Sequence, residues 1–337
     1  MEKIFVAVVI FTAALGGVGA GPPQRSGIHR VAIVMEGRTS RVQPQVNGLR
    51  DGLEELKYVQ GENLISELLE DESRETLRSK LASQIKRQKI DVIVTLGTVE
   101  TAIAKELTQE IPIVFLPASD PVRSGFVRSL ADPGTNLTGL TFYSGFENLS
   151  SGFGNLSKQL EVFKDVVPSL RNAFTIIDAR HPMLIKTQNL TKLHSVAARF
   201  GVDLVELWVH SPAEATQKLA TLPQQPKQAG VFVVCSGLFK ELTMLASSAI
   251  KRRLPLSGCN AFQVAEQGVL LSYAPDLYSI GYRGAWYVNR IFSGTKPQTL
   301  PVETSTKFDM VINRKTATEI GLKIPHRMLM LADRVFD

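Results

Sequence analysis

The stretch Asp91-Val92-Ile93-Val94-Thr95-Leu96-Gly97 recurs in outline in the second half of the chain, as Gly230-Val231-Phe232-Val233-Val234-Cys235-Ser236-Gly237. Each copy is an apolar, β-branched run that ends in small residues, precedes a helical pattern and leads to another apolar run entered through proline. Continuous apolar runs of this length are typical of strands buried on both faces of a parallel sheet. The repeat therefore predicts two lobes of one fold type, although any two parallel α/β units share some of this likeness.

Short apolar runs alternate with longer amphipathic stretches on both sides of the two copies, which is the pattern of strand–helix–strand units. Strands are predicted at 31–35, 63–68, 91–95, 113–116, 173–177, 202–207 and 230–234, and helices at 45–57, 74–88, 98–108, 183–200 and 212–222, with one more ending near Val167. We therefore expect an α/β fold of two Rossmann-like, doubly wound lobes. The first takes residues 28–142 plus about 276–297, and the second takes 143–275 plus about 298–333.

The N-terminus has the layout of a secretory signal peptide. Met1-Glu2-Lys3 precedes an apolar run over residues 4–15, and small residues end at Ala20. We predict cleavage after Ala20, so that residues 1–20 are a signal peptide and the protein is periplasmic. An uncleaved membrane anchor is the alternative, but the run is shorter than the ~20 apolar residues that a spanning helix needs.

The formal net charge of +6 raises the question of a nucleic-acid partner. The basic clusters 86–89 and 251–253 fall where helices are expected to end, and cations there stabilise the carbonyl end of the helix dipole. No aromatic residues are interleaved for base stacking, so we expect no nucleic-acid partner. Cys235 and Cys259 each follow a predicted strand and are expected to be neighbours, either bonded to each other or as free thiols.

Sequence signatures of the common enzyme classes are absent. The chain has no dinucleotide-binding glycine motif, no phosphate-binding loop, no zinc-protease motif and no nucleophile elbow. Its five histidines are scattered, with none at metal-ligand spacing to another. We therefore expect a binding protein with no cofactor and no metal rather than an enzyme.

Small and hydroxylic residues follow the two repeated strands, at the edge where open α/β sheets bind ligands. Thr95, Gly97 and Thr98 lie between the first copy and its helix, and Ser236 and Gly237 occupy the matching place in the second. If both turns open a helix, their N–H groups and hydroxyls lie at its positive end. We predict that they hold a ligand carboxylate.

Other polar residues follow further strands of the same pattern. Ser119 is a candidate donor, and Asp120 either accepts from a ligand ammonium or, as the favoured interpretation, caps the helix that follows. The remaining predicted ligand-binding residues are Glu36, Thr39, Ser40, Asp178, Asn260 and Tyr273. Polar and aromatic groups that converge in this way suit a small amphipathic ligand.

Many ordered blocks of the chain resemble the tryptophan/tyrosine-type ABC-transporter substrate-binding proteins of bacteria. The likeness extends from Val31 to Asp337. The blocks that carry it are 48–56, 91–94, 111–114, 119–127, 130–139, 294–297, 300–303, 306–313, 321–325 and 332–333. Two places depart from the family pattern: Tyr273-Ala274-Pro275-Asp276 stands where the family often has glycine second, and residues 143–155 are rich in glycine and asparagine.

The resemblance implies a periplasmic-binding-protein type I-like fold, with a hinge and an interlobe cleft. The cleft would close on a small, amino-acid-like solute, for example an aromatic one. It also implies delivery to an ABC permease in the inner membrane, driven by an ATPase on other chains. A ligand-sensing protein that docks on a membrane receptor and an enzyme on a doubly wound fold are the alternatives. A sugar-type repressor would need a helix-turn-helix before the first strand, where the signal peptide stands.

Overall fold

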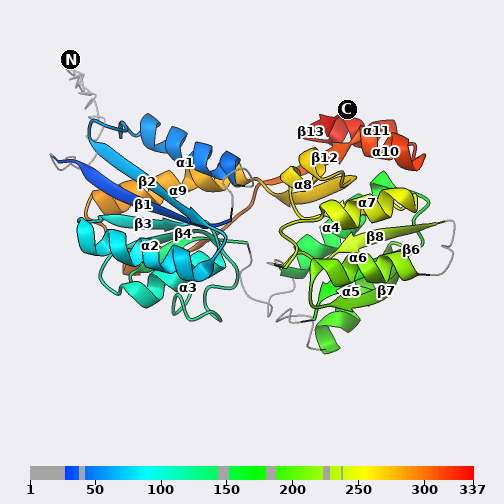
Figure 1. Ribbon diagram of the computed structural model, residues 1–337, viewed down its shortest axis with the longest axis horizontal. Coiled ribbons are helices and arrows are strands. Elements are labelled where there is room, and N and C mark those ends of the chain that lie inside the picture. The colour runs from blue at the N-terminus through cyan, green and yellow to red at the C-terminus, as the bar shows by residue number, and fades with distance from the viewer. Residues whose placement is uncertain (1–26, 38–41, 143–151, 180–186, 223–227, 237) are drawn as a thin grey trace, which may run out of the picture.

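The computed structural model describes residues 27–37, 42–142, 152–179, 187–222, 228–236 and 238–337. Two lobes lie side by side, each a sheet covered by helices, and extended segments cross between them (Figure 1). The predicted signal peptide lies outside the described residues. In the described part, no helix is both long and apolar enough to cross a membrane.

The first lobe contains a six-stranded sheet in which all neighbouring strands are parallel. In spatial order its strands are β11 (Glu303–Thr304), β5 (Leu137–Thr141), β4 (Ile113–Ala118), β3 (Val92–Thr95), β1 (His29–Glu36) and β2 (Leu64–Asp71). Its helices are α1 (Gln43–Glu55), α2 (Arg74–Arg87), α3 (Thr98–Leu107) and α9 (Leu277–Phe292), with the short helix η2 (Pro297–Thr299). Helix α9 comes late in the chain, so the chain returns to this lobe after building the other.

The second lobe contains a seven-stranded sheet, parallel except where β12 runs antiparallel to β10. In spatial order its strands are β13 (Arg334–Phe336), β12 (Phe308–Asn313), β10 (Leu271–Pro275), β9 (Leu256–Gly258), β8 (Ala229–Val233), β6 (Asn172–Asp178) and β7 (Asp203–Val209). Its helices are α4 (Gly152–Val166), α5 (Thr187–Arg199), α6 (Pro212–Thr221), α7 (Thr243–Lys251), α8 (Ala261–Glu266), α10 (Arg314–Ile320) and α11 (His326–Leu331).

The central strands are largely apolar because both faces of each sheet are covered. Val92 and Val94 of β3 pack with α1 and α9, whereas Ile93 points to the other face and packs with α2 and α3. In the second lobe, the side chains of β8 divide in the same way between the cluster under α4 and α5 and the cluster under α6 and α7. Because the side chains on both faces of these strands are buried, solvent-facing polar positions are missing and the runs are nearly continuous apolar stretches.

The internal repeat is present in the topology. The order β2-β1-β3-β4-β5 in the first sheet corresponds to β7-β6-β8-β9-β10 in the second. This confirms the predicted α/β fold of two doubly wound lobes. The repeated sequence stretches are the equivalent strands β3 and β8.

Two details differ from the sequence-based expectation. Strand β5 was not predicted, and residues 298–304, which we expected in the second lobe, belong to the first lobe, where β11 pairs with β5. Leu300 and Val302 are buried in the core of the first lobe, and this burial holds the segment there. The final crossing to the second lobe therefore lies between β11 and β12.

Helix ends explain the two basic clusters. Lys86 and Arg87 occupy the last turn of α2, and Lys251 occupies the last turn of α7. Cations at these positions interact favourably with the negative end of the helix dipole. The interpretation of the clusters as helix ends is thus confirmed.

Candidate functional site

The strand ends of the first lobe bring several predicted residues to one edge of its sheet. Glu36 is the last residue of β1, and Gly97 and Thr98 directly precede and begin α3. The Thr98 hydroxyl accepts a hydrogen bond from the backbone N–H of Ser119, at 2.9 Å, which joins the turns after β3 and β4. Thr95 lies differently, because it is fully buried and its hydroxyl is bonded to that of Thr101.

A residue that was not predicted, Glu100, occupies the N-terminal end of α3. Its side chain is only 5% exposed, and its Oε1 accepts from the backbone N–H of Glu36 at 2.7 Å. A Cβ at Gly97 would overlap this carboxyl group, so glycine makes room for it. Burial raises the pKa of Glu100 above its ordinary value. The positive end of α3, where we expected a ligand carboxylate, is therefore filled by a carboxyl group of the protein itself.

Asp120 caps a turn rather than a helix. Its Oδ1 accepts from the backbone N–H of Arg123 at 3.2 Å, and its backbone carbonyl oxygen accepts from the backbone N–H of Ser124. No helix follows, because the chain forms consecutive turns from Pro121 to Gly125, where Gly125 adopts a positive φ of 67°. The expected helix is wrong, while capping by Asp120 is what the structure shows.

The strand ends of the second lobe form a matching edge. Asp178 is the last residue of β6 and is 8% exposed. The hydroxyl of Ser236, just after β8, donates to Oδ2 of Asp178 at 3.2 Å. Helix α7 begins only at Thr243, so the expectation that Ser236 and Gly237 open a helix is wrong. Residues 238–242 are not helical, and Phe239 and Leu242 of this segment are buried.

The other predicted residues have mainly structural contacts or lie outside the described part. Asn260 caps α8, because its side chain accepts from the backbone N–H of Gln263 at 3.0 Å. Tyr273 lies within β10, where its ring stacks on Phe308 with centroids 5.3 Å apart and packs against the cluster under α4. Thr39, Ser40 and Gly237 lie outside the described residues.

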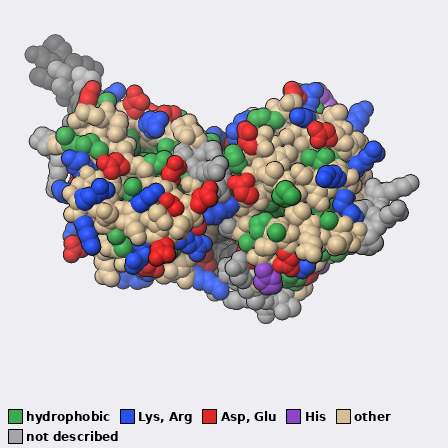
Figure 2. Space-filling view, in the orientation of Figure 1, with side chains coloured by type: hydrophobic (Ala, Val, Ile, Leu, Met, Phe, Trp, Pro, Cys, Tyr) green, Lys and Arg blue, Asp and Glu red, His purple; other side chains and the backbone are tan. Residues whose placement is uncertain are grey.

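An ion pair connects the two edges across the lobes. The Nζ of Lys240, in the loop between β8 and α7, lies 2.6 Å from Oε2 of Glu36, whose other oxygen is 3.1 Å from Nε of Arg74. Burial alone raises the pKa of Glu36, but hydrogen bonds from Lys240 and Arg74 outweigh it and leave that pKa below its ordinary value. The surface is notched between the lobes, and acidic and basic side chains flank the notch (Figure 2). The carboxyl-end edges of the two sheets thus face each other.

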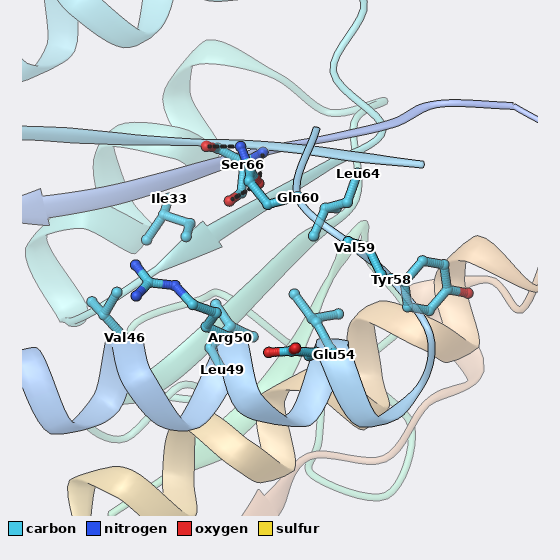
Figure 3. A pocket seen from close by; sticks show the side chains of 11 residues that line it. Ile33, Val46, Leu49, Arg50, Glu54, Tyr58, Val59, Gln60, Leu64 and Ser66 are labelled. Atoms are coloured by element: carbon cyan, nitrogen blue, oxygen red, sulfur yellow. Dashed lines mark hydrogen bonds between the residues drawn. The ribbon is translucent and has the colours of Figure 1, made fainter. Parts of the chain in front are cut away.

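A separate cavity of about 190 Å³ lies within the first lobe, between α1 and the strands β1 and β2 (Figure 3). Six of its lining side chains are aliphatic, Arg50 and Glu54 of α1 also line it, and its polar members Gln60 and Ser66 are bonded to each other. Leu64, the first residue of β2, lines it. The cavity therefore lies toward the starts of the strands, away from the edge where Glu36 and Lys240 meet.

Within the described ranges, no group of three or more His, Cys, Asp or Glu side chains is placed to hold a metal ion. At the edges, Glu36 is ion-paired with Lys240 and Arg74, whereas Asp178 accepts from the Ser236 hydroxyl. Their arrangement suits recognition of a small polar molecule by hydrogen bonds and ion pairs.

Comparison with known proteins extends over nearly the whole chain. The family model of ABC transporter substrate-binding proteins matches residues 30–336. A protein of Clostridioides difficile (strain R20291) named tyrosine-binding protein is 23% identical over 277 residues, which are 82% of this chain and 76% of that protein. A crystal structure of a conserved domain protein from Vibrio cholerae O1 biovar El Tor has a TM-score of 0.74 at 25% identity, covering 91% of this chain and 99% of that one. An ABC domain from Streptococcus pneumoniae, solved in complex with L-Trp, has a TM-score of 0.75 at 20% identity, covering 92% and 100%.

Proposed function

Because the chain belongs to the family of ABC transporter substrate-binding proteins, we propose that it captures a small, amino-acid-like solute between its two lobes as the extracytoplasmic component of an importer. The solute would be released to a permease in the inner membrane, driven by an ATPase on other chains. The predicted signal peptide, residues 1–20, supports a periplasmic location.

The observation that carries the proposal is the opposition of two equivalent strand-end edges. Ligands of open α/β sheets bind beyond the carboxyl ends of the strands, and here each lobe contributes such an edge. The contact between Glu36 and Lys240 brings the two edges within reach of one molecule. Ser119, Gly97 and Ser236 line these edges and are the residues we propose to hydrogen-bond the solute.

The proposed solute class rests on the relatives and on the charges of the site. The similar protein of C. difficile is named for tyrosine, and the similar domain of S. pneumoniae was solved with L-Trp. Both are zwitterions with an aromatic side chain. The two edges here present carboxylates and an ammonium group, which complement such a molecule.

A thermal-shift screen of the purified protein against the twenty amino acids, their decarboxylated amines and common sugars tests the proposal. A solute at 100 times its dissociation constant adds about 2.7 kcal/mol of stability, which is readily seen as a rise in melting temperature. We expect one or a few amino acids to stabilise the protein and sugars to have no effect. Stabilisation by sugars alone would contradict the proposed solute class, and calorimetry of each hit should give one site per chain.

A further inference from the structure

The position of Glu100 excludes one simple way of binding an amino acid. Helix N-termini are common sites for ligand carboxylates. At α3, however, the Glu100 carboxyl group already lies against Gly97 and accepts from the backbone N–H of Glu36. A ligand carboxylate at this place would meet a second carboxyl group in a largely buried setting, which is unfavourable. The first lobe is therefore suited to a ligand cation rather than an anion.

Glu36 supplies the complementary charge for such a cation. Its side chain is 11% exposed, and Lys240 of the opposite lobe contacts it at 2.6 Å. Lys240 belongs to the second lobe and Glu36 to the first. Their contact therefore lies between the lobes, where a ligand would bind. Arg74 pairs with the other oxygen of Glu36 from within the first lobe and is far more exposed, at 67%.

The loop that carries Lys240 is held on both sides of the residue. The carbonyl oxygen of Phe239 accepts from Nε2 of Gln263 at 2.8 Å, and the backbone N–H of Leu242 donates to Oε1 of Gln267 at 2.7 Å. The backbone of Lys240 is thus fixed, while its side chain remains 38% exposed and free to change partner. A flexible ammonium group on a fixed backbone is well placed to follow a ligand.

From these contacts, and resting on the proposed function, we infer that a zwitterionic solute replaces the direct Glu36–Lys240 ion pair by two new ones. Its ammonium group pairs with Glu36 of the first lobe, and its carboxylate pairs with Lys240 of the second. The solute then bridges the lobes through the same two side chains that contact each other here. Both side chains keep an ion pair, which matters most for Glu36 because its side chain is largely buried.

Two-ended recognition makes a sharp prediction for molecules that lack one charged group. An amine without the carboxylate must take Glu36 from Lys240 and leave Lys240 without a partner. A carboxylic acid without the ammonium group takes Lys240 from Glu36 and leaves Glu36 with only its contact to the exposed Arg74. A hydrogen bond between charged partners contributes enough that its loss should weaken binding about tenfold or more.

The test uses calorimetric titration with L-tryptophan and tryptamine, and with L-tyrosine and tyramine. The variant is Lys240→Met, with Lys240→Arg as the charge-retaining variant. The matched control is Lys218→Met, because Lys218 is similarly exposed at 43% and pairs with Glu214 of its own helix α6, not with a residue of the other lobe. Glu36→Gln, titrated with L-tryptophan and indole-3-propionate, tests the other end independently.

We expect the wild type to prefer the amino acid over its amine by about tenfold or more. Lys240→Met should lose most of this preference, whereas Lys240→Arg and Lys218→Met should keep it. In Glu36→Gln, L-tryptophan should lose its advantage over indole-3-propionate. The wild type could bind the amino acids while Lys240→Met and Glu36→Gln both keep the full preference for them over the amine and the acid. That result would overturn this inference and leave the proposed function standing. A wild type that binds neither L-tryptophan nor L-tyrosine would overturn the inference together with the aromatic assignment of the proposed function.

Discussion

Cys235 and Cys259 are joined by a disulfide, with Cα atoms 5.4 Å apart, that connects the ends of the neighbouring strands β8 and β9. The sequence predicted that the two residues are neighbours and left their bonding open. The bond lies beside Ser236 and Asn260, so it ties together two turns of the site edge in the second lobe. The loop that carries Lys240 begins directly after it.

Removal of this disulfide should destabilise the second lobe. For a sequence separation of 24 residues, the chain-entropy relation gives about 3.4 kcal/mol. We expect the double variant Cys235→Ser/Cys259→Ser to lower the free energy of unfolding by about 2–4 kcal/mol, measured by urea unfolding. Wild type treated with a reductant should behave like the variant. Equal unfolding midpoints for all three samples would argue against a stabilising bond.

Gly97 and Glu100 lie so close together that a methyl group added at Gly97 should destabilise the protein. Gly97→Ala should displace the Glu100 carboxyl group from the end of α3 and lower the free energy of unfolding by about 1–3 kcal/mol. Gly27→Ala is the control, since nothing lies within 4 Å of the added carbon there. In a Glu100→Ala background the same substitution at Gly97 should cost much less. If the two substitutions are simply additive, the pair does not interact as described.

The buried Glu100 should make stability depend on pH. Because burial raises the pKa of Glu100 in the folded state above 4.5, the folded protein binds this proton more tightly than the unfolded chain. Its contribution to stability therefore falls as pH rises from about 4.5 through the folded-state pKa and stays low above it. Glu100→Gln does not titrate, so the stability of the variant relative to wild type should increase between about pH 4 and pH 7. Parallel stability curves in urea would refute this.

Asp276 and Lys307 lie on two segments that cross between the lobes, with Nζ and Oδ2 2.8 Å apart. Asp276 also caps α9, because its side chain accepts from the backbone N–H of Tyr278 at 3.0 Å. Loss of an N-cap costs about 1 kcal/mol, whereas an ion pair with a lysine that is 65% exposed contributes less. Asp276→Ala should therefore lower the melting temperature clearly more than Lys307→Met does. The reverse order would mean that the ion pair dominates.

The fold could be predicted because its strands and helices have clear hydrophobic patterns in the sequence. Strands such as β3 and β8 are continuous apolar runs, and the helices between them have one apolar face. The repeat of strand, turn, helix and proline-led strand then predicted two equivalent lobes. Strand β5 was missed because Leu137–Thr141 contains threonine and glycine beside its two leucines. Thr138 is buried and donates to the carbonyl oxygen of Leu300, but a threonine gives no apolar signal in the sequence.

The site was predicted less well because its contacts join residues far apart in the chain. An acidic residue in the first turn of a helix, such as Glu100, usually lies at the surface, and only the approach of Glu36 and Gly97 buries it. Lys240 lies 204 residues from its partner, and nothing in its own surroundings marks it. The late start of α7 was missed because Phe239 and Leu242, which are buried before the helix, lie at a spacing that equally fits a helix.

The central claim is that one solute is held by both lobes, and titration calorimetry of one variant from each edge tests it most directly. Ser119→Ala alters the first edge and Ser236→Ala the second, with Ser195→Ala on the exposed side of α5 as control. Using the amino acid with the largest thermal shift, we predict that each edge variant weakens binding by on the order of 1 kcal/mol, about fivefold, while the control leaves it unchanged. Full affinity in the variant of either edge, with a normal melting temperature, would contradict binding between the lobes.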